Sequence, residues 1–254
     1  MEQLVAFCLR AAKAAGADYA DCRWVETERM GVSVRTGRVD AVESSVSSGF
    51  GVRVLVKGCW GFACSALATE TEAERVAAEA VAIAKASAIA PGAPVVLAPV
   101  EPAVGTWSGR CDVDPFAVPL EKRLALLAEA DEVMRSVSDR IRVTSATAGA
   151  MRCRKLFAST EGARLTQEWT ETGAGIVATA VDAGEVQNRS YPNSHGGGWW
   201  QAGWEAVEAA DLVGNATRVA REAVELIEAP ECPAGVTTVI IDDSQLGLQV
   251  HESI

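Results

Sequence analysis

Apolar residues recur every three or four positions in several stretches of the chain, and this spacing predicts amphipathic helices. The first predicted helix covers residues 3–15 and is followed by Gly16, a common helix stop. A second helix is expected after Thr69 and Glu72, because a Thr and a Glu three residues apart have the spacing of a capping box. Its apolar face would then be formed by small residues, mostly alanines.

The second half of the chain contains two further helical patterns. Pro119 suits the first turn of a helix, because its missing N–H would be unpaired there in any case. A long helix is expected over residues 204–227, and Pro230 and Pro233 follow it as terminators.

Between these helices the apolar period changes to two, which predicts strands. One strand block spans residues 18–65 and the other spans 139–192, and glycines and polar residues divide each block into short predicted strands. Residues 90–118 are rich in proline, glycine and small side chains, so we expect a long connection there. The run VTTVIID, residues 236–242, predicts one more strand before the chain's last residues.

The order helix, strands, helix therefore occurs twice, which favours an α+β fold with antiparallel sheets, flanking helices and an internal duplication. The two possible repeats cover about 1–90 and 119–228, and glycines recur between their strand blocks at an offset of about 125 residues. These glycines are Gly37, Gly49 and Gly51 in the first block, and Gly162, Gly173 and Gly175 in the second.

Charge and hydropathy exclude several classes of protein. The net charge of −11 argues against direct nucleic-acid binding, which needs clustered Lys and Arg. No apolar run reaches the ~18 residues that a membrane-spanning helix requires. The first residues lack the pattern of a signal peptide, so we expect a cytoplasmic protein with no membrane partner.

Metal-binding and redox residues are scarce or scattered. The seven cysteines are odd in number and include no CxxC, so free thiols are expected, with a redox or metal role for Cys59 and Cys64 as the weaker alternative. The two histidines are His195 and His251. A His-rich metal site formed by this chain alone is therefore not expected.

Two glycine-containing motifs suggest catalytic or cofactor loops but lack the required context. SHGGGWW, residues 194–200, resembles an oxyanion loop, yet no G-x-S-x-G nucleophile elbow occurs. We expect instead a surface loop, or a groove for a partner chain lined by Trp199, Trp200 and Trp204. GFGVRV and TGAGIVATA do not open helices, so their glycines are expected to serve a bulge or a close backbone approach within strands.

The last residues, VHESI, carry chemistry of a more specific kind. A zinc peptidase needs imidazole ligands and a carboxylate that takes a proton from water. His251 and Glu252, on the expected first turn of a helix, have the order in which such motifs begin. A second imidazole at i+4 would be residue 255, so the dipeptide alone also fits a chance occurrence.

Longer motifs resemble those of the TldD/PmbA family, whose members have been described as modulators of DNA gyrase. The stretch RTGRVDAVESSVSSGFGVRVLVKGCWGFACS, residues 35–65, is similar to the family's N-terminal signature, including the G-x-G-V-R-V strand and the G-x-W-G-F hairpin. FASTEGARLTQEWTETGAGIVA resembles its second strand block, as does the closing strand before VHESI.

The resemblance implies a TldD-like zinc peptidase that hydrolyses small or unfolded peptides. His251 matches the first zinc ligand of the family's H-E-x-x-x-H motif, and Glu252 matches its general base. It further implies a domain over 1–235, the start of a truncated metallopeptidase domain over 236–254 that would be inactive by itself, and a homodimer or a heterodimer with a PmbA-like paralogue. The alternative is a non-enzymatic peptide-binding or regulatory domain.

Overall fold

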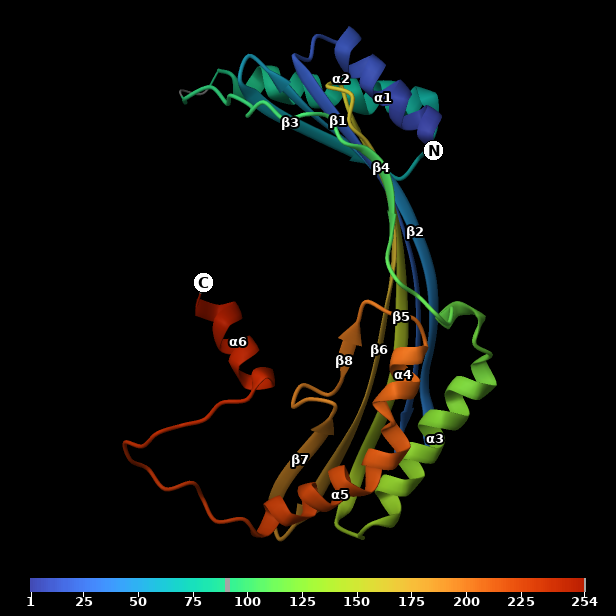
Figure 1. The fold of residues 1–254 in the computed structure, drawn as a ribbon, viewed down its shortest axis with the longest axis vertical. Helices are drawn as coiled ribbons and strands as arrows, with labels where there is room; N and C mark the ends of the chain where they lie inside the picture. Colours follow the sequence, from blue (N-terminus) through green and yellow to red (C-terminus); the bar gives the residue numbers. More distant parts are fainter. Residues whose placement is uncertain (90–91, 254) are drawn as a thin grey trace. The chain divides into compact units, whose positions relative to one another are not determined.

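The computed structural model describes residues 1–89 and 92–253, which form two compact units. Each unit is assembled from separate stretches of sequence, and four long strands contribute residues to both (Figure 1). Unit 1 contains Met1–Glu28, Ser45–Gly109 and Arg152–Trp169. Unit 2 contains Arg29–Ser44, Arg110–Met151 and Thr170–Ile254.

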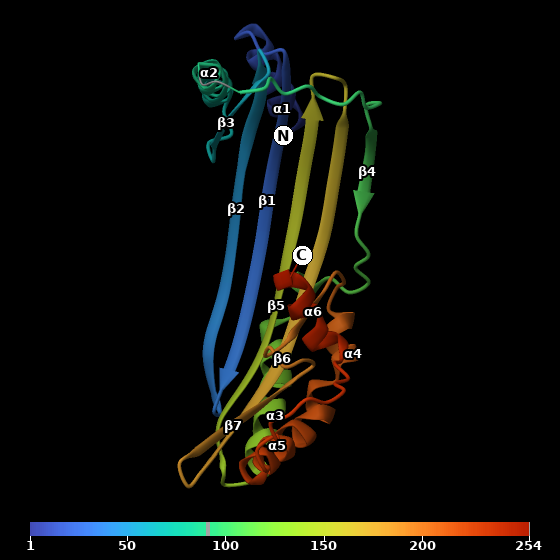
Figure 2. The same cartoon turned by 90° about the vertical axis from the view of Figure 1, so that its left-hand side faces the viewer.

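The strands form one mixed sheet in the order β3-β2-β1-β5-β6-β4, and β7 and β8 also pair with β6 (Figure 2). β3, β7 and β8 pair antiparallel with their neighbours, whereas β4 runs parallel to β6. With helices before and after the strands in each half of the sequence, the predicted α+β class and the repeated order helix, strands, helix are confirmed. The division at residue 235 stays a prediction.

The long strands replace pairs of shorter predicted ones. β1 is Tyr19–Arg35, β2 is Arg38–Val56, β5 is Ile141–Ser159 and β6 is Arg164–Asp182. The prediction that glycines divide these blocks was right at four turns between strands, which contain Gly37, Gly58, Gly162 and Gly184. It was wrong for the glycines inside the strands, because most of these permit close packing instead of a turn. A Cβ at Gly51, for example, would lie 2.8 Å from the ring of Phe62 on β3.

Unit 1 packs two alanine-rich helices together and against the sheet. α1 is Glu2–Ala14 and α2 is Glu70–Ser87, and α2 contacts both α1 and β3, which is Cys59–Ser65. The Thr69 hydroxyl accepts the N–H of Glu72 at 3.3 Å, as the capping pattern predicts. The buried face of α2 consists of Ala73, Val76, Ala77, Ala80, Val81 and Ala84.

The approach of α2 to β3 depends on one glycine. A Cβ built at Gly61 would lie 2.0 Å from the carbonyl oxygen of Ala80 and 2.6 Å from the backbone nitrogen of Ala84. Both obstacles are backbone atoms of a helix, which cannot move aside as a flexible side chain can. Gly61 thus fixes the distance between this helix and the sheet.

A buried carboxylate organises the strands of unit 1. Asp21 has no exposed surface, and its oxygens accept hydrogen bonds from Arg53 at 2.7 and 2.9 Å, from Arg23 at 2.8 Å and from the Tyr19 hydroxyl at 3.1 Å. The Arg53 guanidinium also lies 4.5 Å from the ring centroid of Trp60. Burial and the neighbouring Asp21 carboxylate raise the pKa of Tyr19 to about 12, so its hydroxyl remains a donor.

The predicted connection over 90–118 contains regular structure. β4, Val104–Ser108, pairs with the start of β6, and a 3₁₀ turn follows at Pro115–Ala117. The sequence VGTWS is short and exposed at all five residues, so it carries little of the alternation that identifies strands. Ala90 and Pro91, at the start of this connection, lie outside the described residues.

Unit 2 packs its helices on its own part of the sheet. α3 is Leu120–Ser136, with Pro119 one residue before it, and α5, Leu212–Glu228, contacts both α3 and β7. β7 is Glu185–Tyr191 and β8 is Gly198–Trp200. Leu127, Met134, Ile176, Trp204 and Leu212 are among the largest side chains of the core cluster in this unit.

The long helix predicted over 204–227 is interrupted at Asp211, so that prediction was wrong. α4, Glu205–Ala210, ends where Asp211 adopts φ 45°, and α5 starts at the next residue. The Asp211 carboxylate accepts the N–H of Gly214 at 3.1 Å, so one residue ends one helix and caps the next.

A second buried carboxylate organises unit 2. Asp131 on α3 has no exposed surface and accepts hydrogen bonds from the Thr144 hydroxyl at 2.5 Å, the Gly37 N–H at 2.8 Å and Arg135 Nε at 2.8 Å. Gly37 lies in the β1–β2 turn with φ 78°. The carboxylate therefore joins the helix to a turn and to β5.

Replacing Asp131 with alanine leaves buried donors unpaired, so we expect Asp131→Ala to destabilise the protein by roughly 2–4 kcal/mol. The urea-unfolding midpoint measures this loss. Glu132→Ala is the matched control, because Glu132 is the next residue of the same helix and is exposed. An equal effect of both variants would contradict a special role for the buried carboxylate.

Adding one methyl group at Gly61 should force α2 away from β3. We expect Gly61→Ala to lower stability by roughly 1–3 kcal/mol, the usual cost of overpacking. Gly105→Ala on β4 is the control, because a Cβ there meets nothing within 4 Å. Thermal unfolding of the two variants compares them, and the packing argument fails if Gly61→Ala is no less stable than Gly105→Ala.

Candidate metal centre

The predicted metal-binding dipeptide lies on α6, Asp243–Ser253. Asp242 caps this helix, since its carboxylate accepts the Ser244 hydroxyl at 2.7 Å, the Ser244 N–H at 3.0 Å and the Gln245 N–H at 3.2 Å. These donors hold the pKa of Asp242 below its ordinary value, and the Ser244 hydroxyl has the largest effect. Asp242 and Asp243 therefore lie at the start of a helix.

His251 and Glu252 occupy the last turn of α6, so the expectation that they open a helix was wrong. Their side chains are 80% and 72% exposed, and His251 Nε2 lies 4.0 Å from Glu252 Oε1. No residue of α6 is buried. Both side chains are thus free to bind a ligand and contribute no packing.

The donors at this position fit zinc in type but not in number. Imidazole nitrogen and carboxylate oxygen are both zinc ligands, and a catalytic zinc usually has three ligands from protein. Within residues 1–89 and 92–253 no group of three His, Cys, Asp or Glu side chains is placed to hold a metal ion. His251 and Glu252 therefore offer fewer donors than a catalytic zinc takes from protein.

The segment before α6 has no regular structure. VTTVIID was predicted as a strand, but residues 236–242 are neither strand nor helix, and the prediction was wrong. The side chains of Val236 and Ile240 are almost fully exposed. A strand needs a hydrogen-bonded neighbour, and this run has none within the described part of the chain.

The SHGGGWW loop contacts α6 through one side-chain hydrogen bond and packs closely on β6. Ser194 Oγ accepts Gln245 Nε2 at 2.5 Å, and the His195 N–H is donated to Asn193 Oδ1 at 2.9 Å. A Cβ at Gly175 on β6 would lie 2.2 Å from the carbonyl oxygen of Gly196. The glycines of both segments therefore allow a close approach of two backbones, as predicted for TGAGIVATA.

The three tryptophans near this loop do not line a common groove. Trp204 is 1% exposed and belongs to the core, and Trp200 is half-buried against that core. Trp199 is 60% exposed, with its ring directly over Gly173. The hypothesis of a shared groove for a partner chain is wrong, because Trp204 is not accessible.

None of the seven cysteines, all of which lie within the described residues, is in a disulfide bond, as predicted. Cys8, Cys22 and Cys153 are buried, whereas Cys64 and Cys232 are exposed. Contact with Cys8 and burial raise the pKa of the Cys22 thiol, which disfavours the reactive thiolate.

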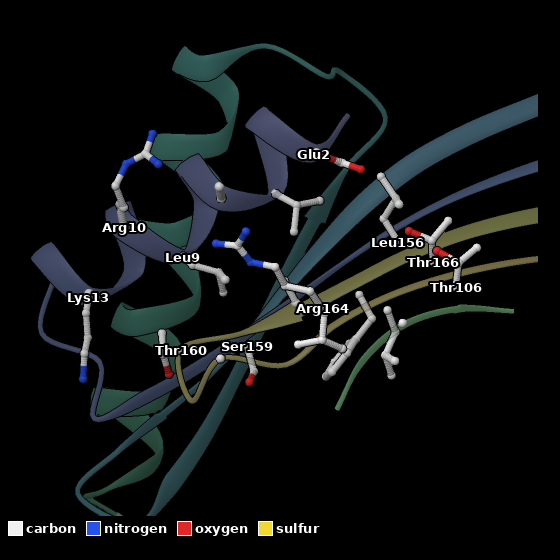
Figure 3. Close-up of a pocket in the computed structure, with 18 residues that line it drawn as sticks. Glu2, Leu9, Arg10, Lys13, Thr106, Leu156, Ser159, Thr160, Arg164 and Thr166 are labelled. Atoms are coloured by element: carbon white, nitrogen blue, oxygen red, sulfur yellow. The ribbon is translucent and has the colours of Figure 1, made fainter. Parts of the chain in front are cut away.

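Sequence reasoning missed a cavity of about 820 Å³ in unit 1, between α1 and the strands β4, β5 and β6 (Figure 3). Arg164, the first residue of β6, reaches into it. The cavity could not be predicted, because the strand that forms one wall, β4, was itself read as part of a connection.

Comparison with known proteins identifies relatives that are named as metalloproteases. Metalloprotease MJ0996 of Methanocaldococcus jannaschii is 25% identical over 237 residues, which cover 93% of this chain and 51% of the relative. Metalloprotease slr0863 of Synechocystis is 29% identical over 239 residues, covering 93% of this chain and 49% of the relative. The chain thus spans about half the length of these relatives.

Solved structures share the fold at low sequence identity. A protein from Thermotoga maritima, named as a candidate modulator of a DNA gyrase, superposes with a TM-score of 0.69 at 15% identity over 92% of this chain and 50% of its own. TldE from Thermococcus kodakarensis superposes with a TM-score of 0.60 at 12% identity. The match covers 90% of this chain and 47% of the TldE chain.

Two family models match consecutive parts of the sequence. PmbA/TldA metallopeptidase domain 1 matches residues 20–84, and the PmbA/TldA metallopeptidase central domain matches residues 113–229. Together with the relatives and the shared fold, these matches show that the chain belongs to the TldD/PmbA family of metallopeptidases.

Proposed function

We propose that this chain contributes to a zinc-dependent peptidase, with His251 as one zinc ligand and Glu252 as the general base. The observation that carries the proposal is the exposed His–Glu pair at the end of α6, in a family whose relatives are named metalloproteases. The remaining ligands would come from outside the 254 residues. Without those ligands, the chain by itself would be inactive.

Each side chain has a role that follows from its chemistry. The zinc ion, when bound, supplies Lewis-acid activation of a water molecule. The neutral His251 imidazole donates a nitrogen lone pair to the metal, and a Glu252 carboxylate oxygen accepts the proton that the attacking water loses. Neither group has a structural task that would compete with this role, because both are exposed.

The substrate, partner and location form part of the same proposal. We infer small or unfolded peptides as substrates, since the relatives are named as proteases, and a dimer with a second copy or with a PmbA-like paralogue. Among the residues that the structure describes, no helix is long and apolar enough to cross a membrane. A cytoplasmic location with no direct nucleic-acid contact is consistent with the charge of −11.

A non-enzymatic peptide-binding or regulatory domain is the second candidate function. It is favoured by the incomplete donor set, because no third ligand is placed near His251 within the described residues. Reading the gene past codon 254 separates the two. A continuing frame that encodes another histidine close by supports the peptidase, whereas an immediate stop codon supports the binding domain.

If the frame continues, the protein expressed to its natural end should hydrolyse peptides and lose this activity to a chelator. Glu252→Gln should retain zinc and lower kcat by roughly 10²–10⁴-fold, because only the proton transfer is lost. His251→Ala should also lower the zinc content, measured by atomic absorption. Chelator-resistant hydrolysis would overturn the proposal.

A functional pair on an exposed helix should be dispensable for folding. We expect His251→Ala and Glu252→Ala in the 254-residue chain to change unfolding free energy by less than about 0.5 kcal/mol. Trp204→Ala should cost roughly 3–5 kcal/mol, because it empties a core position. A large loss of stability in either α6 variant would indicate a structural role instead.

A further inference from the structure

The cavity in unit 1 is separate from the candidate metal centre, because none of its lining residues belongs to α6. Its volume of about 820 Å³ falls in the usual range of small-ligand sites. One wall is α1, and the floor is formed by β4, the end of β5 and the start of β6 (Figure 3). It therefore lies wholly within one compact unit.

The apolar part of the lining favours a ligand with aliphatic groups. Val5, Leu9, Val104, Leu156 and Leu165 line the cavity, and together they come from all four of its elements. Thr106, Ser159 and Thr166 also line the cavity, and their hydroxyl groups can bond to polar groups of a ligand. A ligand with both apolar and polar groups suits this lining better than a plain hydrocarbon chain.

Positive charge is concentrated in the cavity although the whole chain is acidic. Arg10, Lys13 and Arg164 line it, against the single carboxylate of Glu2. Within the part of the chain that the structure describes, no carboxylate pairs with Arg164. Its guanidinium points from β6 toward α1, beside Leu9 (Figure 3). An unpaired guanidinium between apolar walls is suited to a carboxylate.

The opposite charges are separated along α1. Glu2 and Lys13 lie at opposite ends of the helix (Figure 3), and the rise of 1.5 Å per residue places them ~16 Å apart, with Leu9 at ~10 Å from Glu2. An extended peptide advances roughly 3.3 Å per residue, so these distances correspond to about three to five residues. A short peptide has an ammonium group at one end and a carboxylate at the other.

We propose that this cavity binds short free peptides of apolar sequence, with the C-terminal carboxylate on Arg164 and the N-terminal ammonium directed toward Glu2. Charge complementarity at both ends, the distance between the ends and the mixed apolar and hydroxyl lining carry the inference. The site is additional to the proposed metal centre and needs no metal. In a peptidase this site would bind products or short substrates at a place other than the metal centre where the peptide bond is cleaved.

Isothermal titration of the 254-residue chain with a tetrapeptide of alanine and leucine tests the proposal. EDTA is present throughout, so the result does not depend on whether the zinc proposal is correct. We expect saturable one-to-one binding, weakened roughly tenfold or more when the peptide carries a C-terminal amide, because one charged hydrogen-bonding group is lost. N-terminal acetylation should also weaken binding, by a smaller factor.

Arg164→Gln should lower the affinity for the free peptide to that of the amidated peptide. The affinity for the amidated peptide should not change. Arg142→Gln is the matched control, because Arg142 is an exposed arginine on β5 outside the cavity. Circular dichroism shows whether each variant is folded. If Arg164→Gln is not folded, Arg164→Lys provides the second test, because it keeps a positive charge but loses the planar fork that binds a carboxylate.

Absence of saturable binding would overturn the proposal, as would equal affinity for the free, amidated and acetylated peptides. Decanoate that binds as tightly as the peptide would also overturn it, because the site would then recognise an apolar carboxylate and not a peptide. Binding that is lost in Arg142→Gln as strongly as in Arg164→Gln would place the peptide elsewhere on the protein.

Discussion

Each compact unit depends on one aspartate that is removed from water and held by several donors. Asp21 gathers the guanidinium groups of Arg23 and Arg53 and a tyrosine hydroxyl, and Asp131 gathers a turn N–H, a threonine hydroxyl and Arg135. A buried carboxylate is tolerated only when its lone pairs are satisfied. These interactions therefore specify which strands and helices lie next to each other, while the alanine-rich cores permit many close arrangements.

Small residues also determine how closely the helices, strands and loops pack. Gly61 brings α2 against β3, and Gly173 and Gly175 bring the SHGGGWW loop and Trp199 against β6. Close backbone contact leaves little room for large side chains, which accords with cores made mostly of alanine and valine. In both units, precise placement comes from polar anchors and from glycine, and the apolar area supplies the driving force.

The predictable parts of the fold were those encoded locally. Helical spacing located α1, α2, α3 and the region of α4 and α5, because a helix buries a stripe that repeats within a few residues. The failures occurred where distant residues decide the outcome. Gly51 lies within a strand because Phe62 packs over it, β4 exists because β6 offers it an edge, and Asp211 divides a helix by adopting φ 45°. The His251–Glu252 pair was visible from sequence for the same local reason, whereas the cavity around Arg164 requires four elements to meet.

The uncovered run VTTVII, residues 236–241, affects how the purified chain will behave. Four of its six side chains are exposed aliphatic groups, and it contains neither charge nor proline. Such hexapeptides readily stack into intermolecular cross-β ribbons when nothing shields them. Concentrated samples can therefore form oligomers by fibril-like pairing that is unrelated to any physiological dimer. A lysine introduced within the run should prevent the fibril-like pairing and leave a physiological dimer intact. Light scattering of the variant would therefore distinguish the two kinds of oligomer.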